Sequence, residues 1–388
     1  MGVTAAAGFR AAGISAGLKA SGKPDMALVV NDGPIRVAAG VTTSNRVFAA
    51  PVKWTRKVLA GGQLDAVILN SGGANACTGV LGYADAVATA EYVAAALGTE
   101  SKRVAVCSTG LIGERLNMQA LLGGIDKAAE ALTADGGKAA AHAIMTTDTV
   151  PKTVTITANG PAGASFTVAG MAKGAGMLAP GMATMLVVLT TDAVATSMEL
   201  DSALKAATRA TFDRLDSDGA MSTNDTVLLL ASGASGMEPG VEVLTQAVTM
   251  VCDQLAEALM ADAEGSTKDI EIEVVHAASE DDAVEVGRSV ARNSLVKTAF
   301  FGGDPNWGRI LAAVGTTKAT FDADDLDVAI NDVWICRCGS VGEDRSRVDL
   351  SGRAVHVVID LKTGPHSATI RTNDLSLAYV HENSAYSS

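Results

Sequence analysis

The stretch Lys173-Gly-Ala-Gly-Met-Leu-Ala-Pro-Gly-Met-Ala-Thr184 runs directly into Met185-Leu-Val-Val-Leu-Thr190. The first part is rich in glycine and contains Pro180, so it predicts an irregular segment made of turns. The second part is a continuous apolar run, which is typical of a strand that is buried on both faces. The sequence therefore predicts that Thr184 stands where an irregular loop enters a core strand.

Strand-like and helix-like patterns alternate on both sides of this stretch. Short apolar runs that end in small polar turns predict buried strands at 65–70 and 103–107. Apolar spacing of three and four residues predicts packed helices at 83–97, 198–212 and 243–261.

Apolar and acidic residues alternate at 270–274, which predicts a strand with one buried and one exposed face. Ser279 precedes three acidic residues and predicts a helix N-cap. Together these patterns predict a mixed α/β fold.

The composition predicts a large folded core and limits the partners. The chain has 388 residues, of which 48% are hydrophobic and 19% charged, enough for two or three domains. Its net charge of −13 disfavours nucleic acid and membrane surfaces as partners. No stretch approaches the roughly 18 apolar residues that span a bilayer, and no signal peptide is recognisable. We therefore expect a soluble cytoplasmic protein.

Cysteine and histidine give no clear metal or disulfide pattern. The five cysteines are odd in number and irregularly spaced, and only Cys336 and Cys338 lie close together. Their neighbours read as a strand, so buried or edge thiols are the expectation there. The five histidines are scattered, and the sequence predicts no metal site.

Thr184 invites a chemical interpretation, because a threonine hydroxyl becomes nucleophilic when a base takes its proton. Cleavage of the Ala183–Thr184 bond would supply that base, since the new α-amine has a pKa near ~8. Residues 108–110 follow a buried strand and offer amide and hydroxyl donors for an oxyanion. Each of these signals has a commoner structural explanation: a strand-initiating threonine and an ordinary strand-end turn.

The signals in combination resemble the ornithine acetyltransferase (glutamate N-acetyltransferase) family. The segment from Lys173 to Thr184 resembles the family's autocleavage segment. Further stretches that resemble the family follow one another along the chain: Gly40-Val-Thr-Thr-Ser-Asn45, Asn70-Ser-Gly-Gly-Ala-Asn75, Ser108-Thr-Gly-Leu-Ile-Gly113, Met145-Thr-Thr-Asp148, Ser222-Thr-Asn-Asp225, Glu264-Gly-Ser-Thr-Lys268, Leu295-Val-Lys-Thr298, Asp304-Pro-Asn-Trp-Gly-Arg309 and Glu382-Asn-Ser-Ala-Tyr-Ser-Ser388.

The resemblance implies a fold and a chain division. The fold would be a mixed layered α/β sandwich of the ornithine-acetyltransferase and aminopeptidase-like type. Self-cleavage would divide the protein into an α chain, residues 1–183, and a β chain, residues 184–388. Two copies of each would form a heterotetramer.

The resemblance also implies the roles of single residues. Thr184 would be the nucleophile of self-cleavage and of acetyl transfer from N-acetylornithine to glutamate, through an acetyl-threonine intermediate. Thr109 and Gly110 would form the oxyanion hole. The expected substrate contacts are Thr146, Lys173, Thr184, Glu264, Asn383 and Ser388. No metal or bound cofactor would be needed, although some members of the family accept acetyl-CoA as co-substrate.

Two positions depart from the family pattern, which has asparagine where this chain has Gly73 and Gly181. Two other functions stay open at this point. A related N-terminal-nucleophile amidohydrolase or aminopeptidase would share Thr184 but pass the acyl group to water. An uncleaved relative without activity would serve as a binding or assembly protein.

Overall fold

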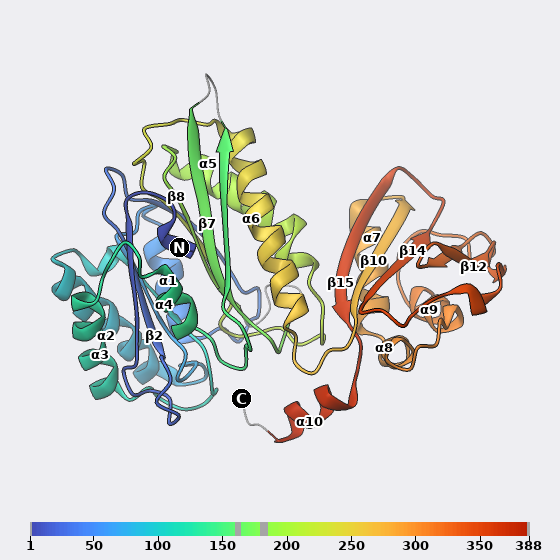
Figure 1. The fold of residues 1–388 in the computed structure, drawn as a ribbon, viewed down its shortest axis with the longest axis horizontal. Coiled ribbons are helices and arrows are strands. Elements are labelled where there is room, and N and C mark those ends of the chain that lie inside the picture. Colours follow the sequence, from blue (N-terminus) through green and yellow to red (C-terminus); the bar gives the residue numbers. More distant parts are fainter. Residues whose placement is uncertain (1, 160–163, 179–184, 386–388) are drawn as a thin grey trace.

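The computed structural model of this chain describes residues 2–159, 164–178 and 185–385. The strands of these residues form three sheets (Figure 1). Two sheets share one hydrophobic core and lie between helices, while the third builds a separate core with its own helices. The predicted mixed, layered α/β fold is confirmed.

The first sheet has the order β1-β2-β4-β5. Its strands are β1 (Phe9–Ile14), β2 (Met26–Asn31), β4 (Ala66–Asn70) and β5 (Val104–Ser108). Helices around it are α1 (Ala50–Leu59), α2 (Gly79–Leu97), α3 (Met118–Glu130) and α4 (Gly137–Ala143). Strands β4 and β5 are parallel, fully buried and close to the predicted bounds. Their carboxyl ends, Asn70 and Ser108, therefore meet at one edge.

The central sheet has the order β3-β9-β8-β7-β6. Its strands are β3 (Val37–Thr42), β6 (Lys152–Asn159), β7 (Ser165–Lys173), β8 (Leu186–Thr191) and β9 (Thr226–Ala231). Every residue of β8 is buried, as the apolar run predicted. Leu186 and Val188 belong to the core shared with the first sheet, while Val187 and Leu189 pack towards α5 (Ser197–Ala210) and α6 (Val241–Ala261).

The third sheet has the order β13-β12-β11-β14-β10-β15. Its strands are β10 (Asp269–Ala277), β11 (Asp327–Ile330), β12 (Val333–Arg337), β13 (Ser340–Val341), β14 (Ala354–Asp360) and β15 (His366–Asn373). Helices of this lobe are α7 (Glu280–Arg292), α8 (Ser294–Phe301) and α9 (Trp307–Val314). The predicted N-cap is confirmed, since Ser279 Oγ accepts the Asp282 amide at 3.1 Å.

The last helix, α10 (Leu377–Ala385), leaves the third lobe and points back below the first two sheets (Figure 1). Short 3₁₀ turns complete the described chain: η1 (Gly2–Thr4), η2 (Ser101–Arg103), η4 (Phe212–Arg214) and η5 (Arg345–Arg347).

Helix α2 corrects one expectation. It begins at Gly79, four residues before the predicted helix, and by length and composition it is apolar enough to cross a membrane. The expectation that no stretch reaches this length was wrong because the additional turn was not included. The helix packs on α1, α3 and β5 and buries Ala86, Ala90 and Val93. Its apolar side is therefore part of the core of this fold.

The predicted chain division falls inside the central sheet. Strands β3, β6 and β7 precede residue 183, whereas β8 and β9 follow residue 184. The two predicted chains therefore share one sheet, and the separate lobe begins only at β10.

Candidate active site

One pocket between the central sheet, the β5 turn and α10 gathers the predicted site residues that the structure describes. Thr109, Gly110, Thr146, Lys173, Glu264 and Asn383 all line it. These residues come from elements that are far apart in the sequence. The predicted residues Ala183, Thr184 and Ser388, and the departure at Gly181, lie outside the described residues.

The turn after β5 presents two possible oxyanion donors. The amide of Thr109 donates to the Asn70 carbonyl at 2.9 Å, so it is already used. Thr109 and Gly110 line the pocket, and no described residue accepts a hydrogen bond from the Gly110 amide. Gly110 has a φ of +131°, and a Cβ there would lie 2.7 Å from the Gly73 amide nitrogen. Glycine is therefore required at this point.

Gly73, the other family departure, lies in the turn after β4 and pairs with Thr109 of the β5 turn. Its amide donates to the Thr109 carbonyl at 3.1 Å, and Asn70 Nδ2 donates to its carbonyl at 3.0 Å. A Cβ at this position would lie 2.9 Å from Leu116 Cδ2, the flexible end of a side chain. Glycine here avoids this close approach and keeps both backbone hydrogen bonds, although it lacks the side-chain amide of the family's asparagine.

Lys173 brings a buried positive charge to the pocket. It ends β7, it is 2% exposed, and its Nζ lies 3.5 Å from the Thr109 hydroxyl oxygen. Burial lowers the pKa of Lys173, while the charges of Asp148, Asp225 and Glu264 oppose that shift.

Asp148 is the carboxylate that balances this charge. Its Oδ1 accepts hydrogen bonds from Lys152 Nζ and from the Gly174 amide, both at 2.7 Å. Burial would raise the pKa of Asp148, but the charges of Lys173 and Lys152 lower it to about 2. The carboxylate also accepts the Thr146 amide at 3.0 Å, so it positions Thr146 and the backbone directly after Lys173. No role for Asp148 was predicted from the sequence, although it ends one of the stretches that resemble the family.

Glu264 supplies a negative charge to the same pocket. Its amide donates to the Ala175 carbonyl at 2.9 Å, and its Oε2 accepts from Asn383 Nδ2 at 3.1 Å. A Cβ on Gly176 would overlap the Glu264 carboxyl group. The absence of a side chain at Gly176 therefore gives this carboxylate its place in the pocket.

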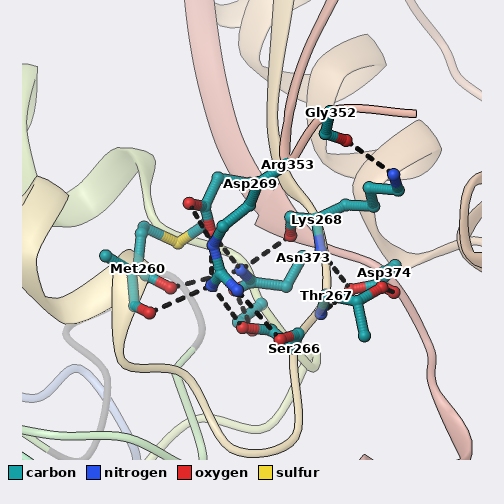
Figure 2. A network of polar contacts seen from close by, with 11 residues as sticks. Met260, Ser266, Thr267, Lys268, Asp269, Gly352, Arg353, Asn373 and Asp374 are labelled. Atoms are coloured by element: carbon teal, nitrogen blue, oxygen red, sulfur yellow. Dashed lines mark hydrogen bonds and ion pairs between the residues drawn. The ribbon is translucent and has the colours of Figure 1, made fainter. Parts of the chain in front are cut away.

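The loop that carries Glu264 is fixed by the third lobe (Figure 2). Asp374 Oδ1 accepts the amides of Thr267 and Lys268 at 2.8 and 2.9 Å. Asn373 Nδ2 donates to the Lys268 carbonyl at 3.0 Å. Arg353 donates to the Ser266 carbonyl at 3.0 Å and pairs with Asp269. The lobe thus holds the loop by its backbone, independently of any ligand.

Asn224 connects the central sheet to the β5 turn and was also missed. Its Nδ2 donates to the carbonyls of Ala74 and Ser108 at 2.6 and 2.8 Å. The residue lies in the pocket wall. Only its place in a family-like stretch signalled it in the sequence.

The arrangement combines hydroxyl and amide donors with one cation and one carboxylate in a pocket of about 710 Å³, open mouth included. This size and polarity suit a small charged molecule rather than a macromolecule.

Comparison with known proteins gives a consistent result. The sequence pattern of the ArgJ family matches residues 10–388. The arginine biosynthesis bifunctional protein ArgJ of Streptomyces coelicolor is 62% identical over 388 residues, which cover all of both chains. The protein of that name from Mycobacterium tuberculosis is 58% identical and aligns with all of this chain and 96% of its own. A solved chain of ornithine acetyltransferase complexed with ornithine, from Mycobacterium tuberculosis, is 55% identical, covers 48% of this chain and 96% of its own, and has a TM-score of 0.43.

Proposed function

This chain belongs to the ArgJ family, and we propose that it is the arginine-biosynthesis acyltransferase that moves an acetyl group from N-acetylornithine to glutamate. The observation that carries the proposal is the convergence of Thr109, Gly110, Lys173 and Glu264 on one pocket. A cation and a carboxylate in one pocket suit an amino-acid ligand, whose carboxylate and ammonium groups need partners of opposite charge.

Thr184 is the proposed nucleophile. Its position in the sequence supports this role, because Leu186 pairs with Lys173 across β8 and β7, at the edge where the pocket lies. Self-cleavage of the Ala183–Thr184 bond would free the α-amine that serves as base.

The transfer then takes two steps. The Thr184 hydroxyl attacks the acetyl carbonyl, its proton passes to the α-amine, and the amide C–N bond breaks as the leaving ornithine amine takes that proton. The amine of glutamate next attacks the acetyl ester, and the threonine oxygen recovers a proton as N-acetylglutamate leaves. The Thr109 hydroxyl and the Gly110 amide would stabilise the oxyanion in both steps.

The proposal includes acetyl-CoA as a second acetyl donor, no metal or bound cofactor, and a heterotetramer of two α and two β chains. The central sheet contains strands from both predicted chains, which supports a lasting association of the α and β chains. We place the protein in the cytoplasm, and its five free thiols suit a reducing compartment.

The test is the intact mass of the purified protein before and after incubation with N-acetylornithine. We expect two fragments, the second beginning at Thr184 and gaining one acetyl group. Added glutamate should remove that group as N-acetylglutamate. If water removes it equally fast, the hydrolase function replaces the transferase.

A substitution of the nucleophile isolates its role. Thr184→Ala should give one uncut chain that forms no acetyl adduct and has no transferase activity, because the attacking hydroxyl is gone. Normal turnover by that variant would disprove the mechanism. An uncut parent protein would instead support the inactive, binding relative.

A further inference from the structure

The loop between η4 and β9 contacts the backbone immediately beyond the predicted cleavage segment. Asp225, the last residue of this loop, accepts the Met185 amide on its Oδ1 at 3.0 Å. The contact follows from topology, because β8 and β9 are parallel and Leu186 pairs with Thr226. Met185 is the residue directly after Thr184 in the chain.

Asp225 is fully buried, at 0% exposed. Like one oxygen of the equally buried Asp216, its Oδ2 has no hydrogen-bond partner of good geometry among the described residues, although the Ser222 hydroxyl is close enough to influence the carboxyl group. Burial raises the pKa of Asp225 well above its ordinary value, against the opposing effects of the Met185 amide, the Ser222 hydroxyl and the Lys173 charge. Acceptance of one backbone amide requires a carbonyl oxygen at this place and not a charge.

The same loop also holds the chain before the cleavage segment. Asp218 Oδ2 accepts the Met177 amide at 2.7 Å, and the Ser217 amide donates to the Leu178 carbonyl at 2.5 Å. Met177 has a φ of +55°, in the left-handed region that favours glycine, so this conformation needs support from its surroundings.

The loop is in turn anchored to the third lobe. Lys297 Nζ donates to the Ser217 carbonyl at 2.7 Å, and the Ser217 hydroxyl donates to Asn373 Oδ1 at 2.7 Å. Asn373 is the residue that also holds the Glu264 loop (Figure 2). Asn373 therefore supports both the loop that contacts the cleavage segment and the loop that carries Glu264.

We propose that Asp218 and Asp225 are positioning residues for self-cleavage, which hold the backbone on the two sides of residues 179–184 by accepting the amides of Met177 and Met185. Fixing both ends of so short a segment restricts where the Ala183–Thr184 bond can lie, and attack needs alignment within an ångström or less. The inference rests on the proposed function, because it assumes that this bond is cut.

The experiment follows the uncut fraction by intact mass after cell-free synthesis of the full chain. Asp225→Ala should slow cleavage on the order of 10²-fold, the cost of a misplacement of about 1 Å. Asp225→Asn keeps the acceptor oxygen and should cleave within about threefold of the parent, since a positioning role needs geometry and not charge. Asp218→Ala and Asp218→Asn should show the same contrast. Because Asp218 is only half-buried, we expect both of these variants to fold.

A matched control lies at the other end of β8. Asp192 is also buried and accepts two backbone amides, those of Ala7 at 3.1 Å and Thr167 at 2.7 Å. Asp192→Ala should lower stability as the Asp225 substitution does, yet cleave at the parent rate.

The outcomes separate the two hypotheses. A parent protein that stays uncut contradicts the proposed function itself. With a cleaving parent, folded Asp225→Ala and Asp218→Ala variants that cleave at the parent rate overturn the positioning role. An Asp225→Asn variant as slow as Asp225→Ala overturns it too, because charge would then be required.

Discussion

Gly176 and Gly110 are positions where a missing side chain shapes the pocket. At Gly110 the backbone has a positive φ, and it lies close to the backbone of Gly73. At Gly176 the backbone has no such constraint, and the Glu264 carboxyl group occupies the space where a Cβ would stand. A substitution at Gly176 therefore tests the proposed contact between Glu264 and the substrate.

Gly176→Ala should raise the KM for N-acetylornithine about tenfold and leave the fold intact. The added methyl group displaces Glu264, and loss of one charge-assisted hydrogen bond costs about 1.5 kcal/mol. Steady-state kinetics measure the change. Gly123→Ala is the control, since nothing lies within 4 Å of a Cβ there. Equal KM values in the two variants would show that Glu264 does not contribute to substrate binding.

Thr109→Val should lower kcat on the order of 10²-fold, because it removes one oxyanion donor and keeps the side-chain shape. The control is Thr190→Val, which removes an equally buried hydroxyl that donates to the Val3 carbonyl at 2.8 Å, far along β8 from the pocket. The control should lose stability but keep its kcat. If both variants keep the parent kcat, the Thr109 hydroxyl is not an oxyanion donor.

At the scale of elements, the sequence was most informative where a local pattern determines the outcome. The all-buried strand β8 follows from its apolar run, and the start of α7 follows from Ser279 and the acidic first turn. Helix ends were less certain, and α2 and α6 both begin a few residues earlier than predicted. Apolar spacing defines the face of a helix, whereas its first turn depends on neighbours that the sequence does not reveal.

Ser279→Ala should lower the free energy of unfolding by about 1 kcal/mol, the usual cost of losing an N-cap acceptor. Urea unfolding of the parent and the variant measures this difference. Ser279→Asp should restore most of it, because a carboxylate is an equally good cap and interacts favourably with the helix dipole. Acetyl transfer should be unchanged in both variants, and no stability difference would mean that the cap contributes nothing.

At the scale of the whole molecule, the site is built from contacts between distant segments. Glu264 comes from the loop after α6, Asn383 from α10 and Thr109 from the turn after β5, and no local pattern predicts that they meet. Resemblance to a family named these residues, but it did not name the groups that hold them. Asp148, Asn224 and Asp225 act through backbone amides and carbonyls, which leave little trace in residue type.

The buried charges beside the pocket predict how stability responds to acid. The folded-state pKa of Asp148, about 2, lies below its ordinary value of 3.8. Its stabilising contribution is therefore complete above pH 3.8 and is lost as the pH falls towards 2. Asp148→Asn should destabilise the protein by about 2 kcal/mol or more at pH 6, and the difference from the parent should shrink through that window. Denaturant unfolding at several pH values measures it, and a constant difference would contradict the assignment.

The central sheet, which contains strands from both predicted chains, affects how the protein can refold after cleavage. In the uncut chain, strands β7 and β8 belong to one polypeptide, and their pairing is a unimolecular event. The proposed cleavage would leave the same pairing between two separate polypeptides, so reassembly from the unfolded state would become second order and depend on concentration. The cleaved protein would then refold less readily than the uncut chain from which it formed. Its lifetime would depend on a low unfolding rate rather than on fast refolding.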